Sequence, residues 1–258
     1  MPHPLTAPLT RGPAHAEQRF TCRVERIVQA TPDIRILWLQ PEGGKRFAFS
    51  AGQYARVSFG GREERDYSLA GRPSEPLLEF HIRNMRGGPS LYVNTHLQEG
   101  ATAEVRGPFG TTYLRGESSA PILAVGGGSG LAPMKSIVEE ALAQGMSQPI
   151  HLYFGARAEG DVYLEEHFAA LTARYPNFRF IPVLSAPSGR TQRRTGLVTD
   201  AIAADFTELS GFSAYLAGPP PMVEAARTVL PRLGLESGAI HADPFIGEAE
   251  RYRREGPK

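Results

Sequence analysis

Four consecutive residues, Arg65-Asp66-Tyr67-Ser68, bring together a permanent cation, a flat aromatic face and a hydroxyl group. Alternate side chains of a β-strand share one face, so Arg65 and Tyr67 would point the same way. A planar ring could stack on Tyr67 while the Arg65 guanidinium binds a phosphate. The exposed end of an ordinary strand could carry the same residues, so this segment alone leaves both interpretations open.

Two glycine-rich segments have the residues needed to bind a dinucleotide. The first, GGGSG at positions 126–130, follows the apolar run 122–125 and precedes a helix-like segment. Glycines let a ligand approach the backbone, and the N-terminus of a helix favours a pyrophosphate. The second, GPPPM at positions 218–222, also ends a strand-like segment and opens a helix. A tight turn would explain one such segment, but two at the carboxyl edge of one parallel sheet would bracket a ligand-binding crevice.

The elements that must position these residues follow two patterns. From about residue 20 to 115, segments rich in β-branched and aromatic residues alternate with Gly, Pro and Asn clusters, which is typical of a small antiparallel barrel. A helix-like segment over 90–98 interrupts this pattern, and the Gly87-Gly88-Pro89 turn before it would favour an anion.

After a linker at 116–120, strand-like and helix-like segments alternate, which predicts a doubly wound α/β parallel sheet with helices on both faces. The predicted strands are 121–125, 150–154, 178–184 and 214–217, and the predicted helices are 134–144, 164–175, 199–206 and 221–233.

Composition excludes several classes of protein. The length of 258 residues suits two domains, and the net charge of +1 gives no indication of nucleic-acid or membrane binding. The single cysteine, Cys22, excludes an internal disulfide and a four-cysteine iron–sulfur or zinc site within these residues, and no metal site is predicted.

No apolar run approaches the roughly 20 residues of a membrane span. Residues 1–18 lack the order of a secretory signal and are interpreted as a disordered leader of a cytoplasmic protein.

Over about residues 20–245, these motifs in this order resemble the flavin reductases of the ferredoxin–NADP reductase type. The resemblance implies a six-stranded antiparallel FAD-binding β-barrel over 19–116, an NAD(P)-binding α/β domain over 117–245 and a charged tail over 246–258. Tyr67 would stack on the flavin ring, Ser68 would approach its reactive edge, and Arg65 would neutralise a phosphate. The segments expected to hold the diphosphate, and so to favour FAD over FMN, are His81-Ile82-Arg83 and Gly88-Pro89-Ser90.

The same resemblance assigns residues to NADH or NADPH. The first glycine segment would contribute Gly127, Gly128, Ser129, Gly130 and Pro133, the second Gly218, Pro219, Pro220 and Met222, and the ribose region Arg157 and Asp161. Two positions depart from the family pattern. Ala217 stands where many relatives have a cysteine near the transferred hydride. Phe245, rather than a terminal aromatic residue, is expected to cover the flavin ring, so Ser68 and Phe245 are the expected catalytic residues.

The implied activity is transfer of a hydride from NADH or NADPH to FAD, and then of single electrons to a separate ferredoxin or other iron–sulfur or haem protein. The alternative is an NAD(P)H:flavin or ferric reductase that uses flavin as a substrate, and a non-catalytic nucleotide sensor is a third hypothesis. The choice between NADH and NADPH stays open. A 2′-phosphate could be bound by Arg190, Arg193 and Arg194, but arginines are also common in ordinary surface loops.

Overall fold

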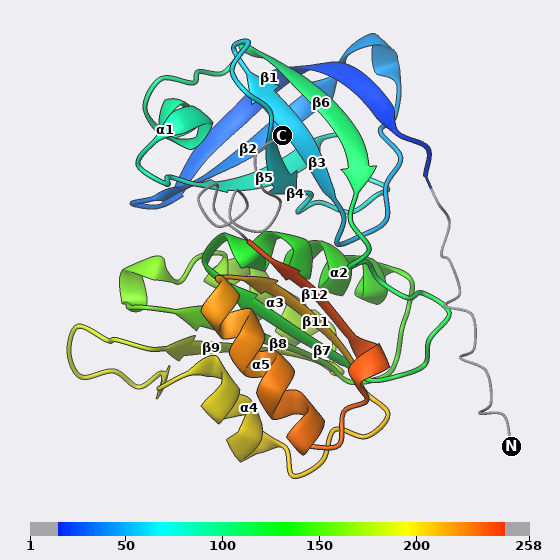
Figure 1. The fold of residues 1–258 in the computed structure, drawn as a ribbon, viewed down its shortest axis with the longest axis vertical. Helices are drawn as coiled ribbons and strands as arrows, with labels where there is room; N and C mark the ends of the chain where they lie inside the picture. Colours follow the sequence, from blue (N-terminus) through cyan, green and yellow to red (C-terminus); the bar gives the residue numbers. More distant parts are fainter. Residues whose placement is uncertain (1–14, 246–258) are drawn as a thin grey trace, which may run out of the picture.

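The N-terminal half of the protein is a barrel of six antiparallel strands (Figure 1). The structure, a computed structural model, describes residues 15–245. The strands lie in the order β4-β3-β6-β1-β2-β5, and a bridge between Leu69 and Phe80 nearly closes the barrel. The predicted antiparallel barrel is confirmed, with strands β1 (Gln18–Thr31), β2 (Ile34–Pro41), β3 (Tyr54–Phe59), β4 (Arg65–Ser68), β5 (Leu78–Arg83) and β6 (Thr102–Phe109).

The C-terminal half is a parallel sheet in the order β10-β9-β8-β7-β11-β12. Helices α2 and α3 cover one face and α4 and α5 the other, which confirms the doubly wound sheet (Figure 1). The strands are β7 (Ile122–Gly127), β8 (Ile150–Ala156), β9 (Phe178–Leu184), β10 (Arg194–Thr195), β11 (Ser213–Gly218) and β12 (Ile240–Pro244). The helices are α2 (Leu131–Ala143), α3 (Glu165–Arg174), α4 (Val198–Asp205) and α5 (Pro220–Arg232).

Alternation along β7 shows why this sheet needs helices on both faces. Ala124 packs with α2 residues such as Ile137, whereas Leu123 and Val125 pack with the apolar residues of α4 and α5. Every residue of β7 is buried, as expected for a central parallel strand. Burial of both faces supplies the apolar contact area that stabilises the domain.

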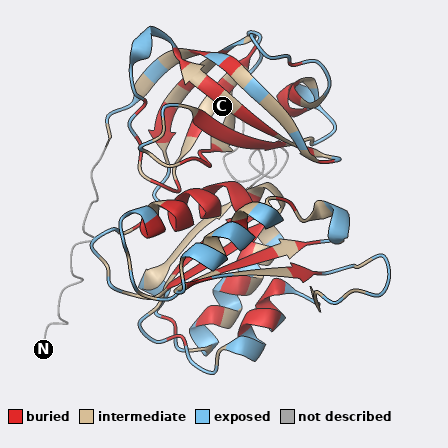
Figure 2. Ribbon diagram, turned by 180° about the vertical axis from the view of Figure 1, so that it is seen from behind, coloured by how far each residue is buried: buried red, intermediate tan, exposed pale blue. Residues whose placement is uncertain are grey.

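Helix α2 lies between the two halves of the molecule and is buried along almost its whole length (Figure 2). Its apolar side shares one cluster with Ile34 and Ile36 of the barrel and with Leu114. Leu114 belongs to the connection 110–121 between β6 and β7, and the predicted domain boundary after residue 116 falls within this connection. The barrel and the sheet are therefore packed through a common apolar interface.

Short elements complete the described chain. The helix predicted over 90–98 begins two residues earlier, as α1 (Gly88–Thr95), because Pro89 suits the first turn of a helix. The four 3₁₀ turns are η1 (Glu42–Gly44), η2 (Gly128–Gly130), η3 (Glu159–Asp161) and η4 (Ser237–Ala239).

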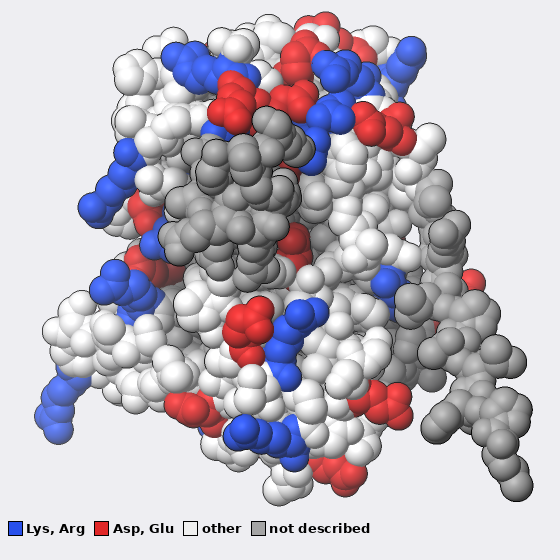
Figure 3. Space-filling model, viewed as in Figure 1, with Lys and Arg blue, Asp and Glu red and all other residues white. Residues whose placement is uncertain are grey.

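The ends of the chain are only partly described. Gln18, which the predicted leader included, is the first residue of β1, while residues 1–14 and the predicted tail 246–258 lie outside the described residues. Within residues 15–245, no helix is long and apolar enough to cross a membrane. On the face seen in Figure 3, Lys and Arg side chains are interspersed with Asp and Glu, in keeping with the net charge of +1.

Candidate functional site

A cavity of about 370 Å³ opens at the carboxyl ends of the parallel strands. From the central strand β7, the sheet continues on one side with β8 and β9. The chain then crosses to the other side of β7 and forms β11, so the strand order reverses between β7 and β11. Open α/β sheets bind ligands at this point. The cavity is lined by several residues that the sequence assigned to NAD(P)H, namely Gly127, Gly128, Arg157, Asp161, Pro219 and Met222.

The two glycine segments pack directly against each other at this edge of the sheet. A Cβ atom on Gly218 would lie 2.7 Å from the Gly127 carbonyl oxygen, and one on Gly130 would lie 2.2 Å from the Ala217 carbonyl oxygen. Gly130 and Gly218 are therefore required for contact between the two loops. They do not line the cavity, nor do the other predicted nucleotide residues Ser129, Pro133 and Pro220.

The barrel supplies the opposite wall of the cavity through Thr31, Asp33 and Arg83. The Arg83 Nε atom donates a hydrogen bond of 2.7 Å to the Asp33 carboxylate, and the Arg83 guanidinium stands over Gly128. Arg83 was predicted to hold the flavin diphosphate, but it lies at the boundary between the barrel and the nucleotide cavity. No sequence motif marks Thr31 and Asp33, because they reach the cavity only through the packing of the two halves.

The arginine side chains near the cavity differ in whether an acidic side chain already binds them. Arg157 is exposed, lines the cavity and has no side-chain partner among residues 15–245. Arg193 binds the Glu165 carboxylate through two hydrogen bonds of 2.6 and 2.8 Å, and Arg194 is paired with Asp205. The loop arginines considered for a 2′-phosphate do not line the cavity.

Asp161 lines the cavity but also stabilises the loop that carries it. One Asp161 carboxylate oxygen accepts a hydrogen bond of 3.1 Å from the backbone amide of Ala158. This bond closes the turn that follows Arg157 at the end of β8, so Asp161 contributes to the shape of the cavity wall.

In the barrel, the hydroxyl groups of Tyr67 and Ser68 are buried and have no hydrogen-bond partner among the described residues. Burial raises the pKa of Tyr67 to about 12, so its hydroxyl stays protonated and able to donate. Buried polar groups in native proteins nearly always have a partner, and a polar ligand beside β4 would provide one. These two hydroxyls fit the predicted flavin. Arg65, predicted to bind a phosphate, forms an ion pair with the exposed carboxylate of Glu63.

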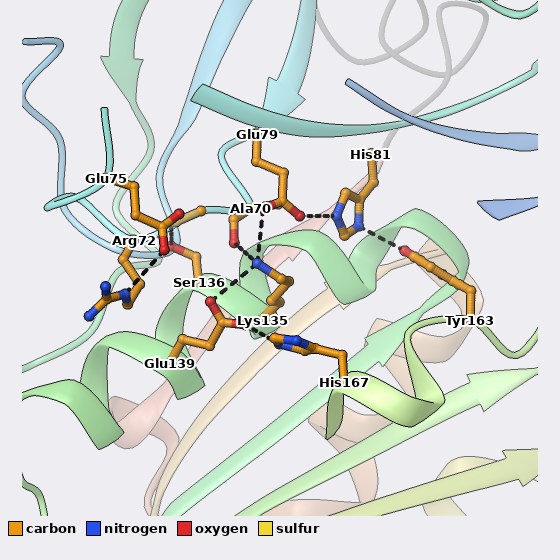
Figure 4. Close-up of polar contacts among 11 residues, drawn as sticks. Ala70, Arg72, Glu75, Glu79, His81, Lys135, Ser136, Glu139, Tyr163 and His167 are labelled. Carbon is orange, nitrogen blue, oxygen red and sulfur yellow. Dashed lines mark hydrogen bonds and ion pairs between the residues drawn. The ribbon is translucent and has the colours of Figure 1, made fainter. Parts of the chain in front are cut away.

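The His81 side chain, which the resemblance assigned to the segment that holds the diphosphate, is bound by other residues of the protein. Its ring is fully buried between the two halves of the molecule, where Nε2 donates to Glu79 at 2.8 Å and Nδ1 accepts from the Tyr163 hydroxyl at 3.0 Å (Figure 4). Burial lowers the pKa of His81, so the ring is neutral at neutral pH. Both ring nitrogens have protein partners, and the His81 side chain is therefore not directed to a diphosphate. The Ile82 side chain is buried in the barrel core.

The Gly88-Pro89-Ser90 segment forms the first turn of α1. The Ser90 hydroxyl donates to the Gly87 carbonyl oxygen and accepts from the Met85 amide, each at 3.0 Å, so its role is to close this turn. Gly88 is exposed with a left-handed φ of 55°, which explains the glycine.

Phe245 is the last described residue, directly after β12. Its backbone amide donates a hydrogen bond of 2.9 Å to the Gly218 carbonyl oxygen, and its ring packs at the edge of the cluster that contains α2. This position places Phe245 beside the second glycine segment. Its expected role as a cover of the flavin ring stays a prediction.

An antiparallel barrel with two buried hydroxyls that lack a partner among the described residues, joined to a doubly wound sheet with a glycine-lined cavity, is the arrangement of a two-domain nucleotide-dependent flavoprotein. A family model described as the oxidoreductase NAD-binding domain matches residues 124–228. The ferredoxin–NAD(P)+ reductase component of the naphthalene 1,2-dioxygenase/salicylate 5-hydroxylase systems of Ralstonia sp is 49% identical over 223 residues, covering 86% of this chain and 67% of its own. The phenol hydroxylase P5 protein of Acinetobacter pittii is 36% identical, with 92% and 68% covered.

Solved structures have the same two-domain fold. The Amycolatopsis cytochrome P450 reductase GcoB superposes with a TM-score of 0.85 at 33% identity, covering 90% of this chain and 71% of that one. The ferredoxin reductase in carbazole 1,9a-dioxygenase superposes with a TM-score of 0.82 at 24% identity, covering 91% and 71%.

The chain belongs to the ferredoxin–NAD(P)+ reductase family of flavin oxidoreductases. It is an oxidoreductase whose cofactors are FAD and NAD(P)H. The chain spans about two thirds of the length of the curated relatives that it matches. The unpaired hydroxyls of Tyr67 and Ser68 fit FAD on the barrel, and the glycine-lined cavity fits the nucleotide.

Proposed function

We propose that this chain is the reductase component of an oxygenase system that acts on an aromatic compound. It would take electrons from NADH or NADPH and deliver them to a ferredoxin. The observation that carries the proposal is the cavity at the switch point of the sheet, whose walls come from both the glycine segments and the barrel strand that ends at Arg83. The similarity to reductase components of naphthalene and phenol oxygenases supports this function.

Each half of the site has a defined task in this proposal. Bound FAD accepts two electrons as a hydride and can release them one at a time. Tyr67 provides an aromatic face, Ser68 provides a hydroxyl for the flavin, and a phosphate would displace the exposed Glu63 carboxylate from Arg65. Gly127 and Gly128 let the nucleotide approach the backbone, and Arg157 binds its adenosine end.

The electron acceptor must bring its own redox centre. The 258 residues contain one cysteine, Cys22, which is buried in the barrel core. An iron–sulfur cluster held by four cysteines therefore has to lie outside these residues. We propose a ferredoxin or a related iron–sulfur or haem protein as acceptor, and the cytoplasm, where NAD(P)H is available, as the place of reaction.

The experiment that tests the function is an anaerobic absorbance spectrum of the purified protein, followed by titration with NADH and separately with NADPH. A flavin band nearly stoichiometric with protein, bleached by one nucleotide, supports a reductase with resident FAD and identifies its donor. Reduction of added plant-type and Rieske-type ferredoxins is then measured in turn. A colourless protein that reduces free flavin, and no ferredoxin, would contradict the proposal and support a free-flavin reductase.

A further inference from the structure

A buried ionic cluster joins α2 of the nucleotide domain to the barrel (Figure 4). The Lys135 ammonium lies 3.0 Å from the Glu79 carboxylate on β5 and 3.2 Å from the Glu139 carboxylate one turn further along α2. The exposed fractions of these three side chains are only 7%, 5% and 9%. At the solvent edge, the partly exposed His167 contacts Glu139.

The same helix is tied to the segment that follows the flavin motif. Lys135 donates to the Ala70 carbonyl oxygen at 3.4 Å, and the buried Ser136 hydroxyl donates to the Gly71 carbonyl oxygen at 2.7 Å. Ala70 and Gly71 follow Ser68, the last residue of β4, after one intervening residue, Leu69. Helix α2 is thus bonded to the backbone next to the predicted flavin site.

A second branch reaches the nucleotide loop. Glu79 binds His81, His81 binds Tyr163, and the Tyr163 hydroxyl lies 3.4 Å from the carbonyl oxygen of Gly128. We call Glu79, His81, Lys135, Glu139 and Tyr163 the interdomain cluster. It connects β5, α2 and the chain before α3 through directional hydrogen bonds and ion pairs, and the Tyr163 hydroxyl extends it to the glycine loop by close contact.

Buried charges are an inefficient way to stabilise the contact between the two halves of the molecule. Removing charges from water is unfavourable, and well-packed apolar residues often replace a buried ion pair with no loss of stability. Apolar contacts, however, have no preferred direction, whereas charge-assisted hydrogen bonds fix distance and angle. The interface already contains apolar contacts between α2 and the barrel, so the interdomain cluster adds orientation rather than area.

We propose that the interdomain cluster, with Lys135 at its centre, is a positioning device for hydride transfer. It holds α2 and the glycine loop before it in one orientation relative to the barrel strands that end at Ser68 and Arg83. A nucleotide bound at the glycine loop then meets the flavin at reacting distance. An error of about 1 Å in such an alignment slows a reaction by about a hundredfold. The inference rests on the NAD(P)H-to-FAD reaction of the proposed function, and not on the identity of the acceptor.

The test uses a triple variant that removes all three buried charges, Lys135→Met with Glu79→Gln and Glu139→Gln, because Lys135→Met alone would leave two buried carboxylates without their buried cation. The rate at which saturating NADH or NADPH reduces bound FAD should fall at least tenfold, while FAD content and nucleotide affinity stay near wild type. The charge-transfer absorbance between nucleotide and flavin should weaken as well. Oxidation of the chemically reduced flavin by ferricyanide needs no nucleotide alignment and should be unchanged.

A readout without cofactor is hydrogen exchange of the apoprotein. Amides of residues 69–71 and 131–139 should exchange faster in the variant, since the contacts that hold these segments together are gone. The matched control is Arg23→Met with Glu25→Gln, which removes an exposed ion pair on β1 and should alter none of these measurements. Tyr163→Phe is the milder second variant and should slow FAD reduction about fivefold by removing one hydrogen bond.

Two results would overturn the inference. One is a wild-type rate of FAD reduction in both the triple variant and Tyr163→Phe. The other is an equal loss of FAD reduction and ferricyanide oxidation, which indicates general damage to the flavin site. A wild-type protein that fails to bind FAD or to react with either nucleotide would contradict the proposed function instead, and the exchange experiment would still test the cluster.

Discussion

The carbonyl oxygen of Ala217 lies 2.2 Å from the position that a Cβ atom on Gly130 would occupy. The two glycine segments are therefore in backbone contact, with no room for a side chain between them. Because the segments flank the switch point of the sheet, this contact positions Gly127, Gly128 and Pro219, which line the cavity.

Gly130→Ala should separate the two segments, because backbone atoms cannot rotate away as a side chain can. We expect a loss of about 3 kcal/mol in the free energy of unfolding, together with weaker nucleotide binding. Urea unfolding and a nucleotide titration measure the two effects. Gly238→Ala is the control, since a Cβ atom there meets nothing within 4 Å. Equal stability of the two variants would show that the segments are not in contact.

Ser68→Ala should leave the apoprotein as stable as wild type or slightly more stable, because it deletes a buried hydroxyl that has no partner among the described residues. Its affinity for FAD should fall, and equilibrium dialysis with FAD measures this. The comparison is Ser136→Ala, which removes a buried hydrogen bond of 2.7 Å to Gly71 and should cost the apoprotein about 1 kcal/mol or more. If Ser68→Ala destabilises the apoprotein as much as Ser136→Ala does, the Ser68 hydroxyl is structural.

Arg157→Met should weaken nucleotide binding about tenfold, since a charged hydrogen bond contributes about 1.5–3 kcal/mol. Arg193→Met should leave nucleotide binding unchanged, because Arg193 is bound to Glu165 and does not line the cavity. Isothermal titration of both variants with NADH and NADPH distinguishes the two arginines. The opposite order of effects would move the adenosine end of the nucleotide to the loop before β10.

Acid should destabilise the protein through Glu79 and His81. Burial alone would raise the pKa of Glu79, but the hydrogen bond from His81 and the charge of Lys135 outweigh it and lower the pKa from 4.5 to about 2. Such a carboxylate stabilises the fold above its unfolded pKa and loses this contribution as the pH falls towards the folded one. His81 acts in the same direction, because burial lowers its pKa below 6.5 and unfolding lets it take up a proton.

Urea unfolding should therefore show a free energy lower by on the order of 2 kcal/mol from Glu79 alone when the pH falls from about 6 to about 3. The variant Glu79→Gln has no titrating group at this position. It should be less stable near neutral pH and less sensitive to acid than wild type. An acid sensitivity equal to that of wild type would place the responsible groups elsewhere.

Local sequence was sufficient for the elements whose pattern is repeated over several residues. The strand at 178–184 was predicted with the bounds that the structure has, because its aromatic and β-branched residues mark it without reference to the rest of the chain. Strands β10 and β12 were missed. The first is only two residues long, and both lie at the edges of the sheet, where pairing with one neighbour sets the strand rather than a buried pattern.

The sequence by itself determined the two-domain class, the glycine segments at strand ends and the Arg65-Asp66-Tyr67-Ser68 motif, since each depends on residues that are close in the chain. Only the tertiary structure decided which side chains meet. It paired His81 with Tyr163 across 82 positions and Lys135 with Glu79 across 56, and it placed Arg83 over the nucleotide loop. Contacts of this kind depend on how one domain packs on the other, which the local pattern of apolar and polar residues does not predict.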